Sequence, residues 1–87
     1  MGQGAKRLTD MRRNPRGDWT IEDVQTVCNE YGIDLQAPGS GSHFKVTHRF
    51  LSEILTIPAR RPIKPVYVKR FVALVTQVLE HLDDSQT

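Results

Sequence analysis

The sequence has little of what several protein classes require. Its single cysteine, Cys28, has no partner for a disulfide within the chain, and such a lone thiol is typical of a protein in a reducing compartment. No apolar run is long enough to span a membrane, and the first twenty residues are polar and basic, so we expect no secretory signal. These absences predict a cytoplasmic protein without a membrane segment.

Metal and nucleophile signals are also scarce. The His, Cys, Asp and Glu residues do not follow the spacing of metal ligands, so we expect neither a metal nor another cofactor. Cys28 and Ser42 both lack a recognisable base with an orienting group, which a nucleophile needs. Cys28 is therefore expected to be a core residue.

The length of 87 residues allows one domain with a small core. A chain of this size buries only roughly 60% of the surface that its unfolded form exposes. We expect marginal stability, which contact with a partner chain would raise.

Charge is strongly segregated although the net charge is only +2. Residues 6–16 carry +4 and residues 17–34 carry −5, whereas residues 45–70 hold seven Lys or Arg against one Glu. A basic surface of this kind suits a polyanion such as RNA. The alternative is a solvated basic face that binds no ligand.

Three segments differ in composition. Residues 1–18 are expected to form a basic N-terminal arm with little to bury, in which Leu8 and Met11 pack only if the arm docks. The domain itself is expected over residues 19–82, and residues 83–87 form an acidic and polar tail.

Two helices are predicted. Thr20 is the N-cap of the first, Asp23 is its capping-box partner and Gly32 ends it, with a stripe of apolar residues between them (Ile21, Val24, Val27, Cys28, Tyr31). The second begins at Pro65, a residue favoured at the first helical position, and carries a longer stripe (Val68, Phe71, Val72, Val75, Val78, Leu79, Leu82).

Three short strands are predicted between these helices, over Ile33–Gln36, His43–Thr47 and Ile54–Ile57. Pro58 is expected to end the third strand because proline gives no donor to a ladder. The second and third strands are joined by a hairpin around residues 49–52.

The predicted fold class is α+β, in the order α-β-β-β-α, with two helices on one face of a three-stranded antiparallel sheet. Side chains alternate along a strand, so Phe44 and Val46 should face the helices and share a core with Val72 and Val75. His43 and Lys45 should then lie on the open face.

His43 is the leading catalytic candidate. It follows Gly41 and Ser42, and glycine permits a close approach of backbone to substrate. Histidine has an unperturbed pKa near roughly 6.5, so it can take or give a proton at cytoplasmic pH. His48 lies roughly 16 Å along an extended strand and cannot share one phosphate with His43. His81 is expected to be a surface residue near a helix end.

The helix, three strands and helix, with Gly41–His43 opening the second strand and Thr56–Pro58 closing the third, resemble the HicA-type toxins. The basic loop and helix start at residues 60–65 are also similar to that family. The resemblance covers about residues 19–80. It implies a double-stranded-RNA-binding-domain-like fold, the activity of an mRNA interferase and inhibition by a HicB-type antitoxin.

The family's catalytic histidine falls on His43, with Gly41 and Ser42 shaping its approach. Relatives often carry a histidine where Arg60 stands here, and an arginine keeps phosphate binding while losing proton transfer. Such an enzyme needs no metal but needs both a base and an acid, and the sequence names only one of the pair.

Four cations are candidate RNA contacts, and we expect them to bind phosphates: Lys45, Arg60, Arg61 and Lys64. The N-terminus of the last helix is expected to add free amide donors. Two alternatives stay open. The fold also serves non-catalytic RNA binding, and the chain is otherwise an interaction module held by a partner protein.

Overall fold

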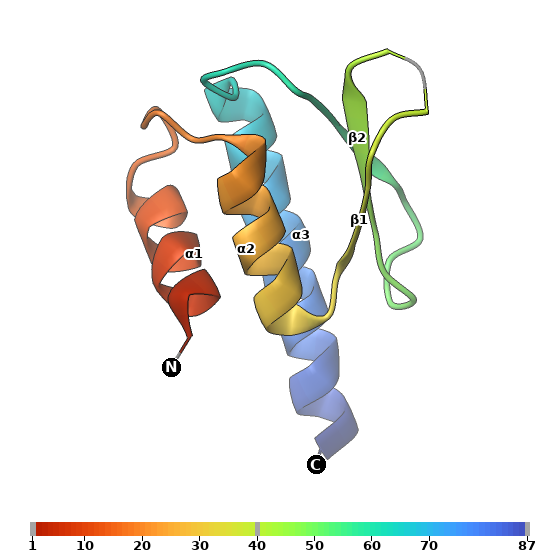
Figure 1. The fold of residues 1–87 in the computed structure, drawn as a ribbon. Coiled ribbons are helices and arrows are strands. Elements are labelled where there is room, and N and C mark those ends of the chain that lie inside the picture. Colours follow the sequence, from red (N-terminus) through yellow and green to blue (C-terminus); the bar gives the residue numbers. More distant parts are fainter. Residues whose placement is uncertain (1, 40, 87) are drawn as a thin grey trace.

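Three helices and a three-stranded antiparallel sheet make up the fold, which is α+β as predicted (Figure 1). The computed structural model describes residues 2–39 and 41–86, and side chains as far as residue 82. The helices and strands are, in chain order, α1 (Gln3–Arg13), α2 (Ile21–Tyr31), β1 (Asp34–Gln36), β2 (His43–Thr47), β3 (Leu55–Pro58) and α3 (Pro65–Gln86). Thr87, at the end of the predicted tail, lies outside the described residues, and the backbone of residues 83–86 continues α3.

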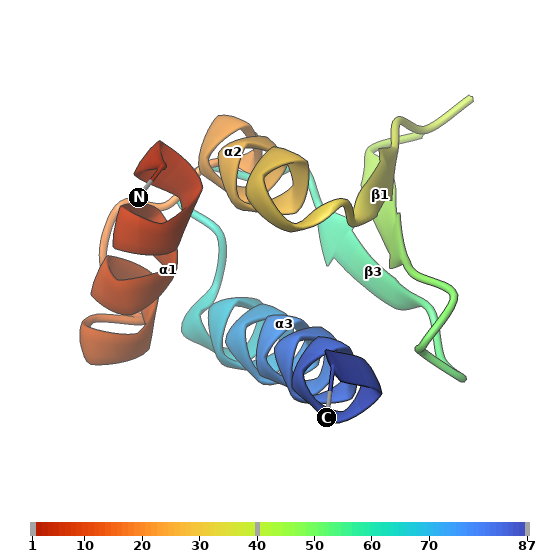
Figure 2. The same cartoon turned by 90° about the horizontal axis from the view of Figure 1, so that it is seen from below.

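The elements form layers. Figure 2 shows α2 and α3 over one face of the sheet, with α1 on the far side of both helices. The core lies between α2, α3 and the sheet, where Val27, Val46 and Val75 are fully buried. Within the described residues, no helix is both long enough and apolar enough to cross a membrane.

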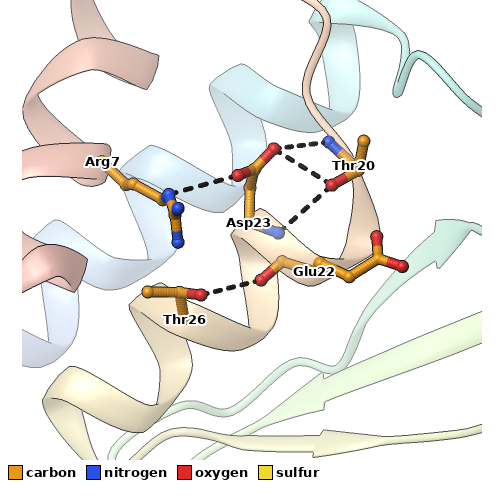
Figure 3. Close-up of polar contacts among 5 residues, drawn as sticks. All are labelled: Arg7, Thr20, Glu22, Asp23 and Thr26. Carbon is orange, nitrogen blue, oxygen red and sulfur yellow. Dashed lines mark hydrogen bonds and ion pairs between the residues drawn. The ribbon is translucent and has the colours of Figure 1, made fainter.

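Local sequence signals fix α2 as predicted. The Thr20 hydroxyl accepts a hydrogen bond from the Asp23 N–H, and the Asp23 carboxylate accepts one from the Thr20 N–H at 2.9 Å (Figure 3). This capping box satisfies donors that the first helical turn leaves free. Gly32 ends the helix in the left-handed conformation, at φ 67°, which glycine adopts without steric cost.

The sheet has the order β1-β2-β3, so β2 is central. Its register places His43 opposite Pro58 and Val46 opposite both Leu35 and Leu55. Pro58 belongs to β3 instead of following it, which corrects the predicted end of that strand. The next N–H, of Ala59, points to β2 and bonds to Ser42 O at 2.6 Å, so the nitrogen of Pro58 faces outward, where no donor is needed.

The segment predicted as a basic arm with little to bury contains a packed helix, because residues 3–13 form α1. Leu8 and Met11 are buried in the core cluster, Met11 completely. Arg7 forms an ion pair with Asp23 at 3.2 Å, as Figure 3 shows, and Arg12 donates to Thr76 Oγ1 on α3. The helix is thus anchored to both α2 and α3.

Gly4 explains how closely α1 approaches α2. It is buried, and a Cβ at this position would lie 2.8 Å from the carbonyl oxygen of Thr26 and even closer to the Glu30 side chain. Only glycine fits this contact without a shift of the helices. The short polar start of the chain therefore holds a specific packing residue that its composition does not reveal.

The predicted core is confirmed for Val46, Val72 and Val75 but not for Phe44. Phe44 is only half-buried and lies outside the core cluster, although it alternates onto the same side of β2 as Val46. Ile54, predicted as the first residue of the third strand, precedes β3 and is 60% exposed.

Candidate nucleic-acid interface

His43 is the first residue of β2 and is exposed. Lys45 is exposed two residues later, whereas Val46 is fully buried against the helices. Since side chains alternate along a strand, His43 and Lys45 share the face of the sheet that α2 and α3 leave uncovered. The structure confirms this placement of both residues.

The segment before His43 is held by backbone geometry. Gly41 has a φ of 92°, in the region that favours glycine, and no atom approaches within 4 Å of the place where a Cβ would stand. Ser42 O accepts the hydrogen bond from Ala59 N–H. This bond ties the start of β2 to the residue that follows β3. Ser40, in the same loop, lies outside the described residues.

A cavity of about 430 Å³ opens beside His43. Two parts of the sequence meet there, namely the start of β2 and the stretch that runs from the end of β3 to the start of α3. The lining residues are Ser42, His43, Pro58, Ala59, Arg60, Lys64 and Tyr67. We call this cavity the His43 pocket.

The pocket brings together four of the seven predicted site residues, which are Ser42, His43, Arg60 and Lys64. The other three lie outside its lining. Gly41 shapes the loop before it, and Lys45 lies in the middle of β2 opposite Thr56. Arg61 forms an ion pair with Asp18 at 3.3 Å, in which both side chains are mostly exposed.

The N-terminus of α3 offers fewer free backbone N–H donors than predicted. Pro65 has no N–H, and the N–H groups of Tyr67 and Val68 both bond to Lys64 O, at 3.0 and 3.2 Å. Only the N–H of Val66 keeps no such partner among the first helical positions described. Positive charge in the pocket therefore comes mainly from the side chains of Arg60 and Lys64.

Three lining residues were not predicted as site residues, namely Pro58, Ala59 and Tyr67, and Tyr67 is the largest of them. The apolar stripe predicted for the last helix begins at Val68, one residue after this tyrosine, and so does not include it. Its position three residues after Lys64 was the available signal, since residues at that spacing share one side of a helical turn.

The other two histidines lie elsewhere. His48 is in the turn between β2 and β3, as predicted, and its Nδ1 accepts a hydrogen bond from the Phe50 N–H at 3.1 Å. Burial, Arg49 and His81 all lower the pKa of His48, which favours the neutral ring that can accept this bond. The Phe50 ring also contacts His81, with centroids 5.3 Å apart. Neither histidine lines the His43 pocket.

Cys28 is a core residue, as predicted. It is completely buried, and burial together with the charge of Asp34 raises the pKa of its thiol to about 12. A thiol with that pKa carries almost no thiolate near neutral pH, so it cannot act as a nucleophile in the folded protein.

Two further cavities differ from the His43 pocket in their lining. The larger, of about 760 Å³, runs between β3 and α3 and includes Glu53, Arg70 and Gln77 but no histidine or aromatic ring. Another, of about 480 Å³, includes His48, Arg49 and Tyr31 in its lining, but it has one cation instead of two and also contains the carboxylate of Asp34, which would repel a phosphate. Volume alone would favour the β3–α3 groove, whereas the convergence of a histidine, two cations and a tyrosine favours the His43 pocket. Within the described part of the chain, no three His, Cys, Asp or Glu side chains are placed to hold a metal ion.

Comparison of the chain with protein families, with curated proteins and with solved structures gave no match in any of the three. The interpretation of the site therefore depends on its own geometry and chemistry.

Proposed function

We propose that the protein is a metal-independent endoribonuclease that acts on mRNA. The observation that supports this proposal most is the pocket itself, where His43 lies with Arg60 and Lys64. An ionisable imidazole supplies acid–base catalysis, and the two cations stabilise the charge that develops on a phosphate.

In the proposed reaction, His43 takes the proton of a ribose 2′-hydroxyl. The 2′-oxygen then attacks the adjacent phosphorus, and the bond from phosphorus to the 5′-oxygen breaks. The products are a 2′,3′-cyclic phosphate and a 5′-hydroxyl, the latter after the leaving oxygen gains a proton. Arg60 and Lys64 hold the phosphate during this transfer, and Arg60 acts only through its charge because a guanidinium does not give up its proton.

The order α2-β1-β2-β3-α3 and the Gly41–His43 segment support the further proposal of a double-stranded-RNA-binding-like fold of the HicA type. The helix α1 is then an addition in front of that arrangement. On this basis we propose that the protein acts in the cytoplasm as the toxin of a toxin–antitoxin pair.

The proposal is tested by incubating purified protein with a labelled transcript in the presence of EDTA, without ribosomes. Cleavage that leaves 2′,3′-cyclic phosphate ends is the expected result. Loss of cleavage on addition of EDTA would instead indicate a metal-dependent reaction, and no cleavage in any buffer would contradict the enzymatic proposal.

Non-catalytic RNA binding is the second candidate. One observation favours it. Among the described residues, His43 is the only histidine that lines the pocket, and Arg60, which also lines it, cannot transfer a proton, so the lining has no second histidine to act as the acid. An RNA-binding protein would retain the transcript in a filter or gel-shift assay and leave it uncut.

The cations allow a quantitative prediction. If Lys64 and Arg60 contact phosphates, the logarithm of the affinity for single-stranded RNA should fall with the logarithm of salt concentration by about 0.7 per contact. Lys64→Ala should reduce that slope by one contact, measured by fluorescence anisotropy from low to high salt. Lys69→Ala is the matched control, since Lys69 is an exposed lysine of α3 that does not line the pocket. An unchanged slope in Lys64→Ala and Arg60→Ala would leave these residues as solvated surface charges.

We also propose a HicB-type antitoxin as the partner. Such a partner should be acidic where it meets Arg60 and Lys64, since complementary charge speeds and orients docking. Expression of the chain alone should arrest growth and co-expression with the antitoxin should restore it. Harmless expression in a host without any such antitoxin would count against the toxin proposal.

A further inference from the structure

Tyr67 is placed differently from Phe71, the other aromatic residue in this part of α3. Phe71, one helical turn later on the same side, is 1% exposed and fills the core. Tyr67 is only half-buried, packs against the edge of that core and lines the His43 pocket. Its ring is therefore held in place by the core while part of it stays accessible.

Tyr67 also has a fixed position relative to the cations. Its N–H donates a hydrogen bond to Lys64 O, and this backbone bond fixes the position of Tyr67 relative to Lys64. Its hydroxyl makes no hydrogen bond with the described part of the chain. The ring, the proline ring of Pro58 and the small side chain of Ala59 supply the apolar part of the pocket.

We propose that Tyr67 is a stacking platform for one unpaired nucleobase, whose neighbouring phosphate is bound by Arg60 and Lys64. This inference rests on the proposed function and specifies its substrate class, which is single-stranded RNA. Aromatic side chains bind unstacked bases through their faces, and a base inside a duplex presents no free face. The pocket volume of about 430 Å³ lies within the range of small-ligand sites, about 300–1,000 Å³.

The proposal distinguishes this site from duplex recognition. A protein that recognises double-stranded RNA contacts phosphates and 2′-hydroxyls across a groove and needs no concave pocket for a base. Here the histidine, the cations and the tyrosine line one cavity, so an entering base and its scissile phosphate can be bound together. His43 then lies next to the ribose of the bound nucleotide.

The test measures binding without cleavage, in a His43→Ala background, with a short single-stranded RNA and with its duplex. Tyr67→Phe keeps the ring and should bind as the parent does. Tyr67→Leu should lower single-strand affinity about tenfold, within the range for loss of one stacked base. Tyr31→Leu is the matched control, because Tyr31 is a half-buried tyrosine of α2 outside the pocket. Thermal melting of each variant shows whether it is folded.

Equal affinity of Tyr67→Leu and its parent would overturn the inference, and so would a preference of the parent for duplex RNA. A loss of affinity in Tyr67→Phe as large as in Tyr67→Leu would also overturn it, because the hydroxyl would then be the group that binds. Failure of the proposed function looks different. In that case the protein with His43 intact cuts no RNA, although binding still depends on Tyr67.

Discussion

Replacement of His43 by alanine should lower the rate of RNA cleavage about 10²–10⁴-fold, the usual contribution of general acid–base catalysis. The affinity for RNA should change little, because the substitution leaves Arg60 and Lys64, the proposed phosphate contacts of the pocket, unchanged. Single-turnover rates on a labelled transcript, with the protein in excess, separate the chemical step from binding.

His81→Ala provides the control for this prediction. His81 is an exposed histidine that contacts Phe50 and does not line the His43 pocket, so its replacement should leave the rate unchanged. Equal rates for His43→Ala and the parent protein would remove His43 from the mechanism. Cleavage lost equally in both variants would point to a folding defect.

Met11→Ala should lower the free energy of unfolding by about 2–5 kcal/mol, the range for truncation of a large buried aliphatic side chain. Met11 is completely buried at the contact of α1 with the core. Because small domains are stable by only about 5–15 kcal/mol, the loss should be evident as a lower urea midpoint.

Lys6→Ala is the matched comparison within the same helix. Lys6 is exposed, and alanine has at least the helix propensity of lysine, so stability should stay within about 0.5 kcal/mol of the parent protein. If Met11→Ala were as harmless as Lys6→Ala, α1 would not be docked in solution and the N-terminal residues would behave as an arm.

Local rules were sufficient for α2, because its start and end depend on neighbouring residues. Thr20 and Asp23 cap one end and Gly32 ends the other, and all three act within a few residues along the chain. The faces of β2 were equally predictable, since alternation of Phe44 and Val46 with His43 and Lys45 assigns the exposed side.

The helix α1 could not be inferred in the same way. Only Leu8 and Met11 are apolar residues that it buries in the core, and the basic residues around them are typical of an arm. Its stability comes from tertiary contacts, which include the close approach at Gly4 and the ion pair from Arg7 to Asp23. Such contacts involve residues that are distant in the sequence, so composition alone predicts the wrong state.

The candidate site was predictable in part. The exposed position of His43 follows from the Gly41–Ser42 segment before it and from the alternation of side chains along the strand. The basic character of residues 60–64 is evident in the sequence. Which cations share a cavity with His43 depends on strand register, since His43 lies opposite Pro58. The ion pair with Asp18 engages Arg61, whereas Arg60 and Lys64 line the pocket with Tyr67.

Pro58 has a consequence for assembly. The outer edge of β3 borders the His43 pocket, and a strand joining the sheet there would find no N–H at Pro58 to bond with. Addition of another chain to this edge is thus interrupted next to His43. The same proline that forms part of the pocket wall therefore disfavours edge-to-edge association at the pocket.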